Sequence, residues 1–366
     1  MCFITAKHSS TGLSLAQIRI WRDIPPVMNQ TEKPLTCWVI SDGRAGIQVQ
    51  CTGLAEAMGL EPVIKNVEMA KPWKWLPPAL IPLHPAVYGN DFPTSQDITT
   101  PDEWPDVTIA CGRQAAIFNA LVREKSRGKT FAIQVQDPRI SSRHYDLVIT
   151  PEHDTLRGDN VLLTTGGINR VTPARLEQAK ADLAPEINAL PRPRVAVLVG
   201  GKSKAYRLTE TIVQKLGVQL HQLQQDSGCS FLVTTSRRTG KEHTAHLRQA
   251  LADLPAFFWD GTGDNPYFGF LGSADAFIVT SDSVNMVTEA ASTGKPVHVV
   301  ELEGGNKKFS RFHQQLKDKG IIRDFTGTLE HWQYPPLSES KRIAKKVLER
   351  LARHKEVRNL VDQART

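Results

Sequence analysis

The stretch from Ala274 to Val300 limits the fold of this chain more than any other part of the sequence. It begins with a short apolar run rich in β-branched residues, Ala276–Val279, which is typical of a buried strand in a parallel sheet. Apolar side chains then recur at helical spacing from Val284 until Gly294 ends the helix, and a second apolar strand begins after Pro296. This order predicts a parallel α/β sheet with helices packed on it.

The polar loop in this stretch contains the first candidate binding residues. Asp282 and Ser283 lie where the carboxyl end of the strand meets the amino end of the helix. Unpaired backbone N–H groups and the helix dipole favour an anion such as a phosphate at that position. Glu289 follows in the same helix, on a side that could face the ribose of a ligand. An ordinary strand–helix junction without a ligand has the same local pattern, so the assignment depends on the rest of the chain.

The alternation of strand, polar loop and helix fills two separate halves of the chain. In the first half we expect strands at Thr36–Ile40, Val63–Val67, Val107–Cys111, Thr130–Val135, Leu147–Thr150 and Val161–Leu163. In the second half we expect strands at Val195–Val199, Ser230–Val233 and Ala256–Trp259, followed by the stretch described above. The intervening segment Ala184–Arg194 has the composition of an interdomain linker. The sequence therefore predicts an α/β fold of two Rossmann-like domains that face each other across a cleft.

These patterns divide the chain into four parts. Residues 1–33 lack sustained periodicity, and we expect a poorly ordered leader there. The first Rossmann-like domain is predicted at residues 34–185 and the second at residues 194–336. Residues 337–366 form a basic tail with nine Lys and Arg against four Asp and Glu, which supplies most of the net charge of +7. The tail either lies on an anionic membrane or packs across the two halves as an amphipathic helix, and we expect the packed arrangement.

One segment departs from the alternating pattern. Pro72–Pro105 contains eight prolines, a density that excludes long helices and central strands. Trp73 and Trp75 also lie in this segment, and tryptophan favours membrane interfaces. A membrane-facing or lipid-acceptor patch is one interpretation of this composition. An irregular segment packed on the first domain is the other, and it is the one that we expect.

Composition excludes several classes of protein. The five cysteines form no CxxC pair, which argues against a disulfide framework or a zinc site and indicates a reducing compartment. No apolar run approaches the roughly 20 residues that cross a bilayer. Stacking motifs and basic recognition helices typical of nucleic-acid modules are absent, so we expect no nucleic-acid partner. We predict a cytoplasmic protein, with peripheral association to a membrane as a further expectation.

Polar residues at the ends of the first-half strands are the candidate catalytic groups. Asp42 lies in the loop Ser41–Gly46, between the first strand and the first helix, and we expect it to project into the cleft. Asp137 and His153 follow two later strands and are the reserve candidates. A general base must reach the acceptor hydroxyl at hydrogen-bond distance. Asp42 is therefore the preferred base.

Loops of the second half carry the candidate binding residues, which could bind a diphosphate without a metal ion. Glycine there allows close backbone approach, and arginine matches phosphate geometry. The predicted set is Gly200, Gly201, Lys202, Ser203, Arg237, Arg238, Asn265, Asp282, Ser283 and Glu289. No Asp-x-Asp metal motif stands in these loops. We therefore expect no metal and no cofactor, with a nucleoside diphosphate sugar as the donor substrate.

Seven motifs give the chain a family resemblance. They read WVISDGRAG, IACGRQAA, IQVQDPR, VLVGGKSKAYRL, TTSRRTG, DNPYFGFLGSADAFIVTSDSVNMVTEAASTGKPV and GGNKKFSRFH. In this order they resemble the ELM-type mitochondrial fission protein family, whose bacterial members are sometimes labelled nucleoside-diphosphate-sugar epimerase-like. The resemblance covers about Thr36 to Phe325. The second half is also similar to GT-B glycosyltransferases that build peptidoglycan precursors and galactolipids.

The resemblance implies a role for each half. By likeness to these transferases, Ser203, Arg237, Ser283 and Glu289 are implied donor-site residues, and the first half would bind the acceptor. The chain differs from the transferases in lacking their amino-terminal Gly-His loop, and Ser41–Gly46 stands in its place.

Three functional hypotheses follow. The leading one is a metal-independent, nucleotide-sugar-dependent glycosyltransferase that acts on a lipid or cell-envelope acceptor at the cytoplasmic membrane face. The second is a non-catalytic adaptor that recruits a membrane-remodelling protein partner, as the role of plant members of the family implies. The third is a sugar-nucleotide epimerase on the same fold.

Overall fold

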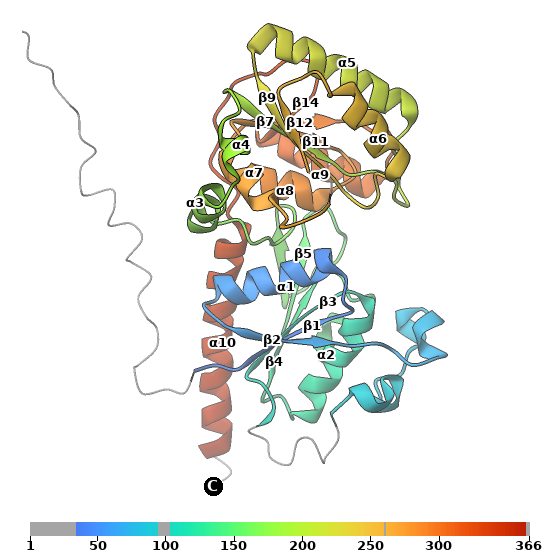
Figure 1. Ribbon diagram of the computed structural model, residues 1–366. Helices are drawn as coiled ribbons and strands as arrows, with labels where there is room; N and C mark the ends of the chain where they lie inside the picture. The colour runs from blue at the N-terminus through green and yellow to red at the C-terminus, as the bar shows by residue number, and fades with distance from the viewer. Residues whose placement is uncertain (1–33, 94–102, 260, 364–366) are drawn as a thin grey trace, which may run out of the picture. The chain divides into compact units, whose positions relative to one another are not determined.

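We describe a computed structural model of the protein that covers residues 34–93, 103–259 and 261–363 (Figure 1). The predicted leader at residues 1–33 lies outside the described residues, as does part of the proline-rich segment. Both sheets belong to one compact unit that begins at Thr36.

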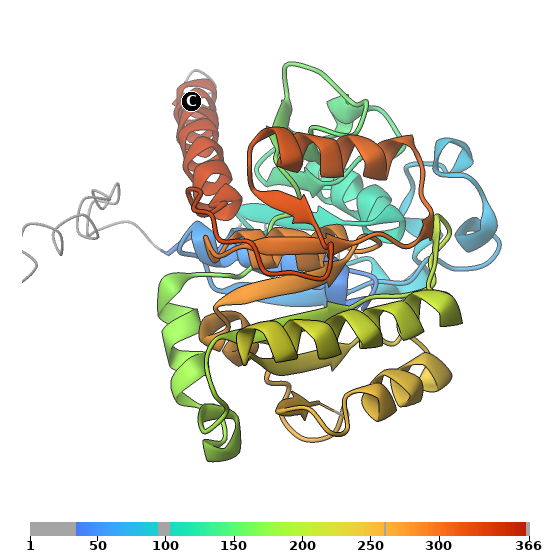
Figure 2. The same ribbon diagram turned by 90° about the horizontal axis from the view of Figure 1, so that it is seen from above.

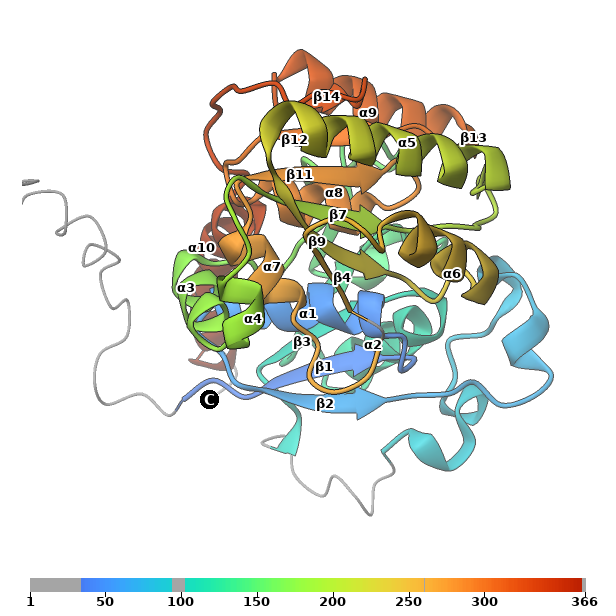
Figure 3. The ribbon, with the colours of Figure 1, turned by 45° about the horizontal axis from the view of Figure 1, so that its top comes forward.

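The first half is built on a parallel sheet of six strands in the order β2-β1-β3-β4-β5-β6. The strands are β1 (Cys37–Ser41), β2 (Pro62–Asn66), β3 (Val107–Cys111), β4 (Phe131–Val135), β5 (Leu147–Pro151) and β6 (Val161–Thr164). Helix α2 (Arg113–Lys125) packs on one face, where Phe118 and Leu121 join the buried cluster that contains Ile40. Helix α1 (Ala45–Ala57) contacts β1 and β3, and β2 forms one edge of the sheet (Figure 3).

The second half is built on another six-stranded parallel sheet, in the order β10-β9-β7-β11-β12-β14. The strands are β7 (Arg194–Val199), β9 (Ser230–Thr235), β10 (Ala256–Phe258), β11 (Ala276–Thr280), β12 (Val297–Val300) and β14 (Ile322–Asp324). Counted within this half, the order is 3-2-1-4-5-6, that of a dinucleotide-binding Rossmann sheet. A short antiparallel pair, β8 (Tyr206–Arg207) and β13 (Glu303–Gly304), lies outside it. The prediction of two Rossmann-like domains is confirmed.

Alternate side chains of β7 point to opposite faces of this sheet, and different helices pack on each face. Val195 and Val197 pack with α5 (Glu210–Ser227) and α6 (Lys241–Ala250). Ala196 and Leu198 pack with α7 (Tyr267–Ser273), α8 (Val284–Ala291) and α9 (Lys307–Asp318). Figure 2 shows α5 extending along the strands. Helix α3 (Pro173–Ala181) packs against α7, and the short helix α4 (Pro185–Asn188) precedes β7.

The basic tail forms α10 (Glu339–Gln363), which packs on the first half. Ile343, Val347 and Leu351 are buried, and the helix contacts α1 and β6. Farther along, Arg350 donates to the carbonyl oxygen of Asp159, and the His354 ring lies 5.2 Å from the ring of Phe131. The tail is therefore packed on the protein as expected, although these contacts of α10 lie on the first half and not across both halves. No helix among the described residues is long and apolar enough to cross a membrane.

The described part of the proline-rich segment contains short 3-10 turns at Trp73–Trp75, Pro78–Leu80, Pro85–Val87 and Gly89–Asp91. Ile81, Val87 and Phe92 are buried in the core of the first half, as expected for an irregular packed segment. Trp75 and Leu80 remain 69% and 66% exposed.

Candidate functional site

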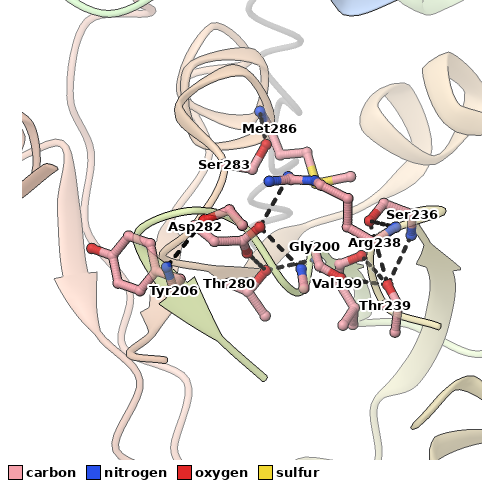
Figure 4. A network of polar contacts seen from close by, with 12 residues as sticks. Val199, Gly200, Tyr206, Ser236, Arg238, Thr239, Thr280, Asp282, Ser283 and Met286 are labelled. Carbon is pink, nitrogen blue, oxygen red and sulfur yellow. Dashed lines mark hydrogen bonds and ion pairs between the residues drawn. The ribbon is translucent and has the colours of Figure 1, made fainter. Parts of the chain in front are cut away.

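The candidate binding loops lie where the strand order of the second sheet reverses. Strand β7 lies between β9 and β11, and the loops after these three strands hold Gly200, Arg238 and Asp282 (Figure 4). Ligands of doubly wound sheets bind outside the carboxyl ends of the strands at such a switch point. The structure therefore brings together three of the loops that the sequence singled out.

The carboxylate of Asp282 connects these three loops. Its side chain is 0% exposed, and it accepts hydrogen bonds from the backbone N–H of Gly201 at 3.0 Å and from Thr280 Oγ1 at 2.7 Å. Arg238 Nη2 lies 2.9 Å from the same carboxylate. Because these donors all come from the protein, Asp282 acts as an internal anchor of the site. Its negative charge is compensated by Arg238.

Two glycines allow the loop after β7 to approach its neighbours closely. A Cβ atom at Gly200 would lie 2.2 Å from Asp282 Oδ1, and one at Gly201 would lie 2.2 Å from the carbonyl oxygen of Arg238. The same carbonyl accepts a hydrogen bond from the backbone N–H of Lys202 at 3.0 Å. Only glycine fits at these two positions without moving the neighbouring loop.

The two serines predicted in the site stabilise local turns. Ser203 Oγ accepts hydrogen bonds from the backbone N–H groups of Ala205 and Tyr206, at 3.2 and 3.0 Å. Ser283 caps the amino end of α8 by accepting a hydrogen bond from the backbone N–H of Met286 at 3.3 Å. In each case the hydroxyl proton remains available for a ligand, since the oxygen acts only as an acceptor in these bonds.

Lys202 and Arg237 are exposed cations of the site. Neither forms an ion pair with any residue that the structure describes, whereas Arg238 is bound to Asp282. An ammonium group and a guanidinium fork are suited to phosphate oxygens.

Glu289 is held by a short chain of contacts at the start of α7. Asn265 Oδ1 accepts a hydrogen bond from the backbone N–H of Tyr267 at 3.0 Å, and the Tyr267 hydroxyl donates to Glu289 Oε2 at 2.6 Å. Burial raises the pKa of Glu289 to about 7, although the Tyr267 hydrogen bond acts in the opposite direction. Asn265 therefore orders the turn that positions Tyr267, and Tyr267 orients the carboxylate.

The raised pKa predicts how Glu289 affects stability. Glutamate titrates near 4.5 in the unfolded chain, so between that value and about 7 the folded state binds a proton that the unfolded state lacks. The contribution is therefore present at low pH and is lost as the pH rises through about 7. A shift of this size corresponds to about 3 kcal/mol.

Urea unfolding of the wild type and Glu289→Gln, at several values between about pH 5 and pH 8, measures this contribution. The stability of the wild type relative to the variant should fall as the pH rises. Burial lowers the pKa of His153 and His313 to about 4, which gives the opposite trend, but these residues are common to both proteins and cancel in the difference. A difference that is constant across the range would contradict the assignment.

The preferred base, Asp42, is engaged by a neighbour in its own loop. Its side chain is 2% exposed, and Arg44 Nη2 lies 2.6 Å from its Oδ2. The loop follows β1 at the switch point of the first sheet, where β1 lies beside β3. A Cβ atom at Gly112, which follows β3, would lie 3.7 Å from Asp42 Oδ2.

The two reserve candidates are also engaged locally. Asp137 accepts a hydrogen bond from the backbone N–H of Arg139 at 2.8 Å, and its Oδ2 lies 3.4 Å from Arg139 Nη1. The His153 ring is buried, and its centre lies 5.3 Å from the centre of the Phe312 ring. The lowered pKa of His153 keeps this imidazole neutral at ordinary pH. Its Nδ1 atom has no hydrogen-bond partner among the described residues. His153 borders an open depression of about 500 Å³ that is lined mainly by α9.

Polar contacts join the two halves near the amino ends of α1 and α8. Asn285 Nδ2 donates to the carbonyl oxygen of Gly46 at 3.5 Å, and Gln50 donates to Asn285 Oδ1 at 3.4 Å. Farther along α8, Thr288 Oγ1 accepts a hydrogen bond from the backbone N–H of Gly167 at 3.3 Å. The loop that carries Asp42 thus leads to Gly46, the residue that contacts Asn285 in the first turn of α8.

Sequence reasoning missed several residues that hold this arrangement together, namely Thr280, Tyr267, Asn285 and Gln50. Thr280 and Tyr267 lie within one of the sequence motifs given above, but their hydrogen-bond partners are set by the tertiary fold. Asn285 and Gln50 carry no local signal, because the hydrogen bond that joins them connects the two halves of the chain.

Sequence comparisons identify relatives of the chain. The sequence model of the family described as "Mitochondrial fission ELM1" matches residues 45–351. Mitochondrial fission protein ELM1 of Arabidopsis thaliana is 33% identical over 275 residues, which cover 68% of this chain and only 64% of the plant protein. Uncharacterized protein RP120 of Rickettsia prowazekii (strain Madrid E) is 25% identical over 356 residues, which cover 85% of this chain and 97% of that protein.

Solved structures resemble the fold at low sequence identity. A putative UDP-N-acetylglucosamine 2-epimerase from Listeria monocytogenes has a TM-score of 0.56 and 13% identity, with 88% of this chain and 97% of that chain covered. The UDP-GlcNAc 2-epimerase of Methanocaldococcus jannaschii has a TM-score of 0.54 and 11% identity, with 86% and 100% covered. These likenesses support the fold of two Rossmann-like domains of the GT-B type. The family match goes further, because it covers every strand of the two six-stranded sheets except β1, as well as the first half of α10, and the chain therefore belongs to the mitochondrial fission ELM1 family.

Proposed function

We propose that this chain binds a nucleoside diphosphate sugar at the switch point of its second sheet and transfers the sugar to a lipid or cell-envelope acceptor. The transfer would occur at the cytoplasmic face of a membrane, by GT-B-type chemistry without a metal. One observation carries the proposal. Gly200 and Gly201 are held at the switch point with the capped amino end of α8, while Lys202 and Arg237 stay exposed and without ion pairs among the described residues.

Each part of the donor has a chemical counterpart in this arrangement. Lys202, Arg237 and the amino end of α8 would bind the diphosphate, and Ser203 and Ser283 would donate hydroxyl hydrogen bonds to it. The carboxylate of Glu289 would accept hydrogen bonds from the ribose hydroxyls. The UDP-GlcNAc 2-epimerases named above act on a ligand of this class, which agrees with the proposal.

The proposed reaction balances with the groups at hand. A bond forms between the acceptor oxygen and the anomeric carbon as the bond from that carbon to the diphosphate oxygen breaks. The leaving diphosphate gains negative charge, which the cations and the helix dipole would stabilise. The acceptor hydroxyl loses its proton to a base, for which we propose Asp42 with Asp137 and His153 in reserve. Asp42 must first exchange its partner Arg44 for the acceptor hydroxyl.

Calorimetric titration with UDP-, GDP- and CMP-sugars tests donor binding. We expect saturable binding of at least one donor, and a loss of at least about tenfold in affinity for Arg237→Ala, because a charge-assisted hydrogen bond is worth about 1.5–3 kcal/mol. Arg143→Ala is the matched control, since Arg143 is an exposed arginine of the first half. Equal affinity in the two variants, or no binding of any donor, would contradict the proposal.

A non-catalytic adaptor is the second candidate, and one observation favours it. None of the three candidate bases is presented freely, since Asp42 and Asp137 pair with arginines and the His153 ring is buried against Phe312. An adaptor would bind a protein partner and need no nucleotide, so the titration above separates it from the enzyme. An epimerase, the activity named for the solved relatives, would convert the donor alone, which NMR of a donor-only incubation detects.

A further inference from the structure

Three loops at the end of the second sheet carry more positive charge than a nucleoside diphosphate sugar needs. Residues 200–208, 236–241 and 303–308 contain eight Lys and Arg and a single Asp or Glu. Three of the cations are neutralised by ion pairs, which are Arg207 with Glu303, Arg238 with Asp282, and Lys308 with Asp154. Lys202 and Arg237 are assigned to the donor above. This leaves Lys204, Lys241 and Lys307, which we call the outer rim.

Backbone contacts hold the three loops side by side. The backbone N–H of Gly305 donates to the carbonyl oxygen of Ala205 at 2.6 Å, which joins the loop of Lys307 to the loop of Lys204. The backbone N–H of Lys202 donates to the carbonyl oxygen of Arg238 at 3.0 Å, and Lys241 follows three residues later. The rim therefore runs along one continuous strip of backbone beside the donor site.

All three rim lysines are exposed, and none forms an ion pair in the described part of the chain. Acidic groups close to them are few. Glu242 lies next to Lys241 in the first turn of α6, while Glu303, Asp282 and Asp154 are already paired.

Two of the rim lysines occupy positions that are unfavourable for a cation. Lys241 is the first residue of α6 and Lys307 is the first residue of α9, where the helix dipole presents its positive end. Gly240, which precedes α6, has no side chain to cap the first N–H groups of that helix. Cations at such positions destabilise the helix unless an anion binds there. Local departures from favourable placement mark functional sites.

We propose that the outer rim binds a phosphate group carried by the acceptor. This inference rests on the proposed function for the existence of an acceptor, and it names the chemical class of that acceptor. The donor brings two phosphates, which the inner cations and α8 match, so the outer charge is left for a further anion. A lipid headgroup and a soluble phosphate ester both supply this chemistry.

The test compares two triple variants that change the net charge by the same amount. The first variant reverses the charge of the three rim lysines, through Lys204→Glu/Lys241→Glu/Lys307→Glu. The second variant reverses the charge of three exposed residues of α10, the other basic surface, through Lys345→Glu/Lys346→Glu/Arg353→Glu. Two probes distinguish the sources of phosphate, namely vesicles of phosphatidylcholine with about 30% phosphatidylglycerol, and soluble sn-glycerol 3-phosphate. Pure phosphatidylcholine vesicles control for binding without negative charge.

We expect the wild type and the α10 variant to bind at least one probe. The rim variant should bind that probe at least about tenfold more weakly, because each basic residue near an anionic surface contributes about 1 kcal/mol to the binding free energy. If the rim variant loses only vesicle binding, the phosphate belongs to a lipid headgroup. If it loses glycerol phosphate binding, the phosphate belongs to a soluble ester. Binding that is lost in the α10 variant and retained in the rim variant overturns the proposal, as does absence of binding to both probes.

A parallel titration with a UDP-sugar keeps the two proposals distinguishable. The rim variant should bind the donor within about twofold of the wild type, since only charges outside the donor site are changed. If no nucleotide sugar binds and rim-dependent phosphate binding persists, the donor site is refuted and the rim stands.

Discussion

Asp282→Ala should lower the free energy of unfolding by about 3 kcal/mol and abolish donor binding. Removing one partner of a buried charge pair costs about 3–5 kcal/mol, and the lower end applies because Arg238 is 40% exposed and can be hydrated. The backbone N–H of Gly201 and the hydroxyl of Thr280 also lose their acceptor in the interior. Without this anchor, the loops after β7 and β9 lose their common attachment to β11.

Urea unfolding measures the stability change, and Asp324→Ala is the control. Asp324 also pairs with a lysine, Lys317, but its side chain is 60% exposed, so its removal should change the free energy of unfolding by less than about 1 kcal/mol. Equal losses in the two variants would show that the burial of Asp282 does not matter for stability.

Gly200→Ala is expected to have the second largest effect, a loss of about 2–3 kcal/mol. The added methyl group would lie 2.2 Å from Asp282 Oδ1, an atom that is fixed by Thr280 and therefore cannot move freely. Overpacking of this kind typically costs about 1–3 kcal/mol. Gly158→Ala is the matched control, because its new Cβ would meet Val161 at an ordinary distance of 3.4 Å.

The double variant Gly200→Ala/Asp282→Ala tests whether the two effects share one cause. Once the carboxylate is removed, the alanine methyl group has space, so the penalty of Gly200→Ala should shrink by at least about 1 kcal/mol. Additive losses would mean that the close approach of Gly200 to Asp282 is not the source of the strain.

The alternating strands and helices could be predicted from the sequence because each buried strand is a short apolar run. The expected strand at Val107–Cys111 matches β3 residue for residue. Helix α5 runs from Glu210 to Ser227 and continues without a break through Gly217. Gly217 resembles a helix end in sequence, yet it faces Ala250 of α6, where a Cβ would meet its neighbour at 3.0 Å. Tertiary packing thus explains a glycine that local propensity treats as a stop.

Two elements near the end of the second half were missed. Helix α9 follows Gly304–Gly305 and is rich in charge, so its apolar face, with Phe312 and Leu316, is short. Strand β14 has three residues, of which Ile322 is buried and the next two are exposed. Strand β14 is too short for recognition from sequence, whereas the apolar residues of α9 do recur at helical spacing, among many charged ones.

The loops of the candidate site could be located from the sequence, but the roles within them could not. The position of Asp282 at the start of a helix predicts a ligand-binding residue. In the structure its carboxylate instead binds Gly201, Thr280 and Arg238. Likewise, nothing in the sequence indicates that Arg44 would pair with Asp42. Both facts depend on side-chain partners rather than on position along a strand.

The polar contacts of α8 with the first half have a consequence for movement. Asn285 and Thr288 reach Gly46 and Gly167 through single hydrogen bonds, and such bonds can be replaced by water with little loss of free energy. Four buried apolar clusters, by contrast, each pack on a single sheet, two on the first sheet and two on the second. Hinge-like opening would therefore expose polar groups at α8 and leave these clusters intact, but it would also have to separate Lys308 from Asp154 and His153 from Phe312 at α9.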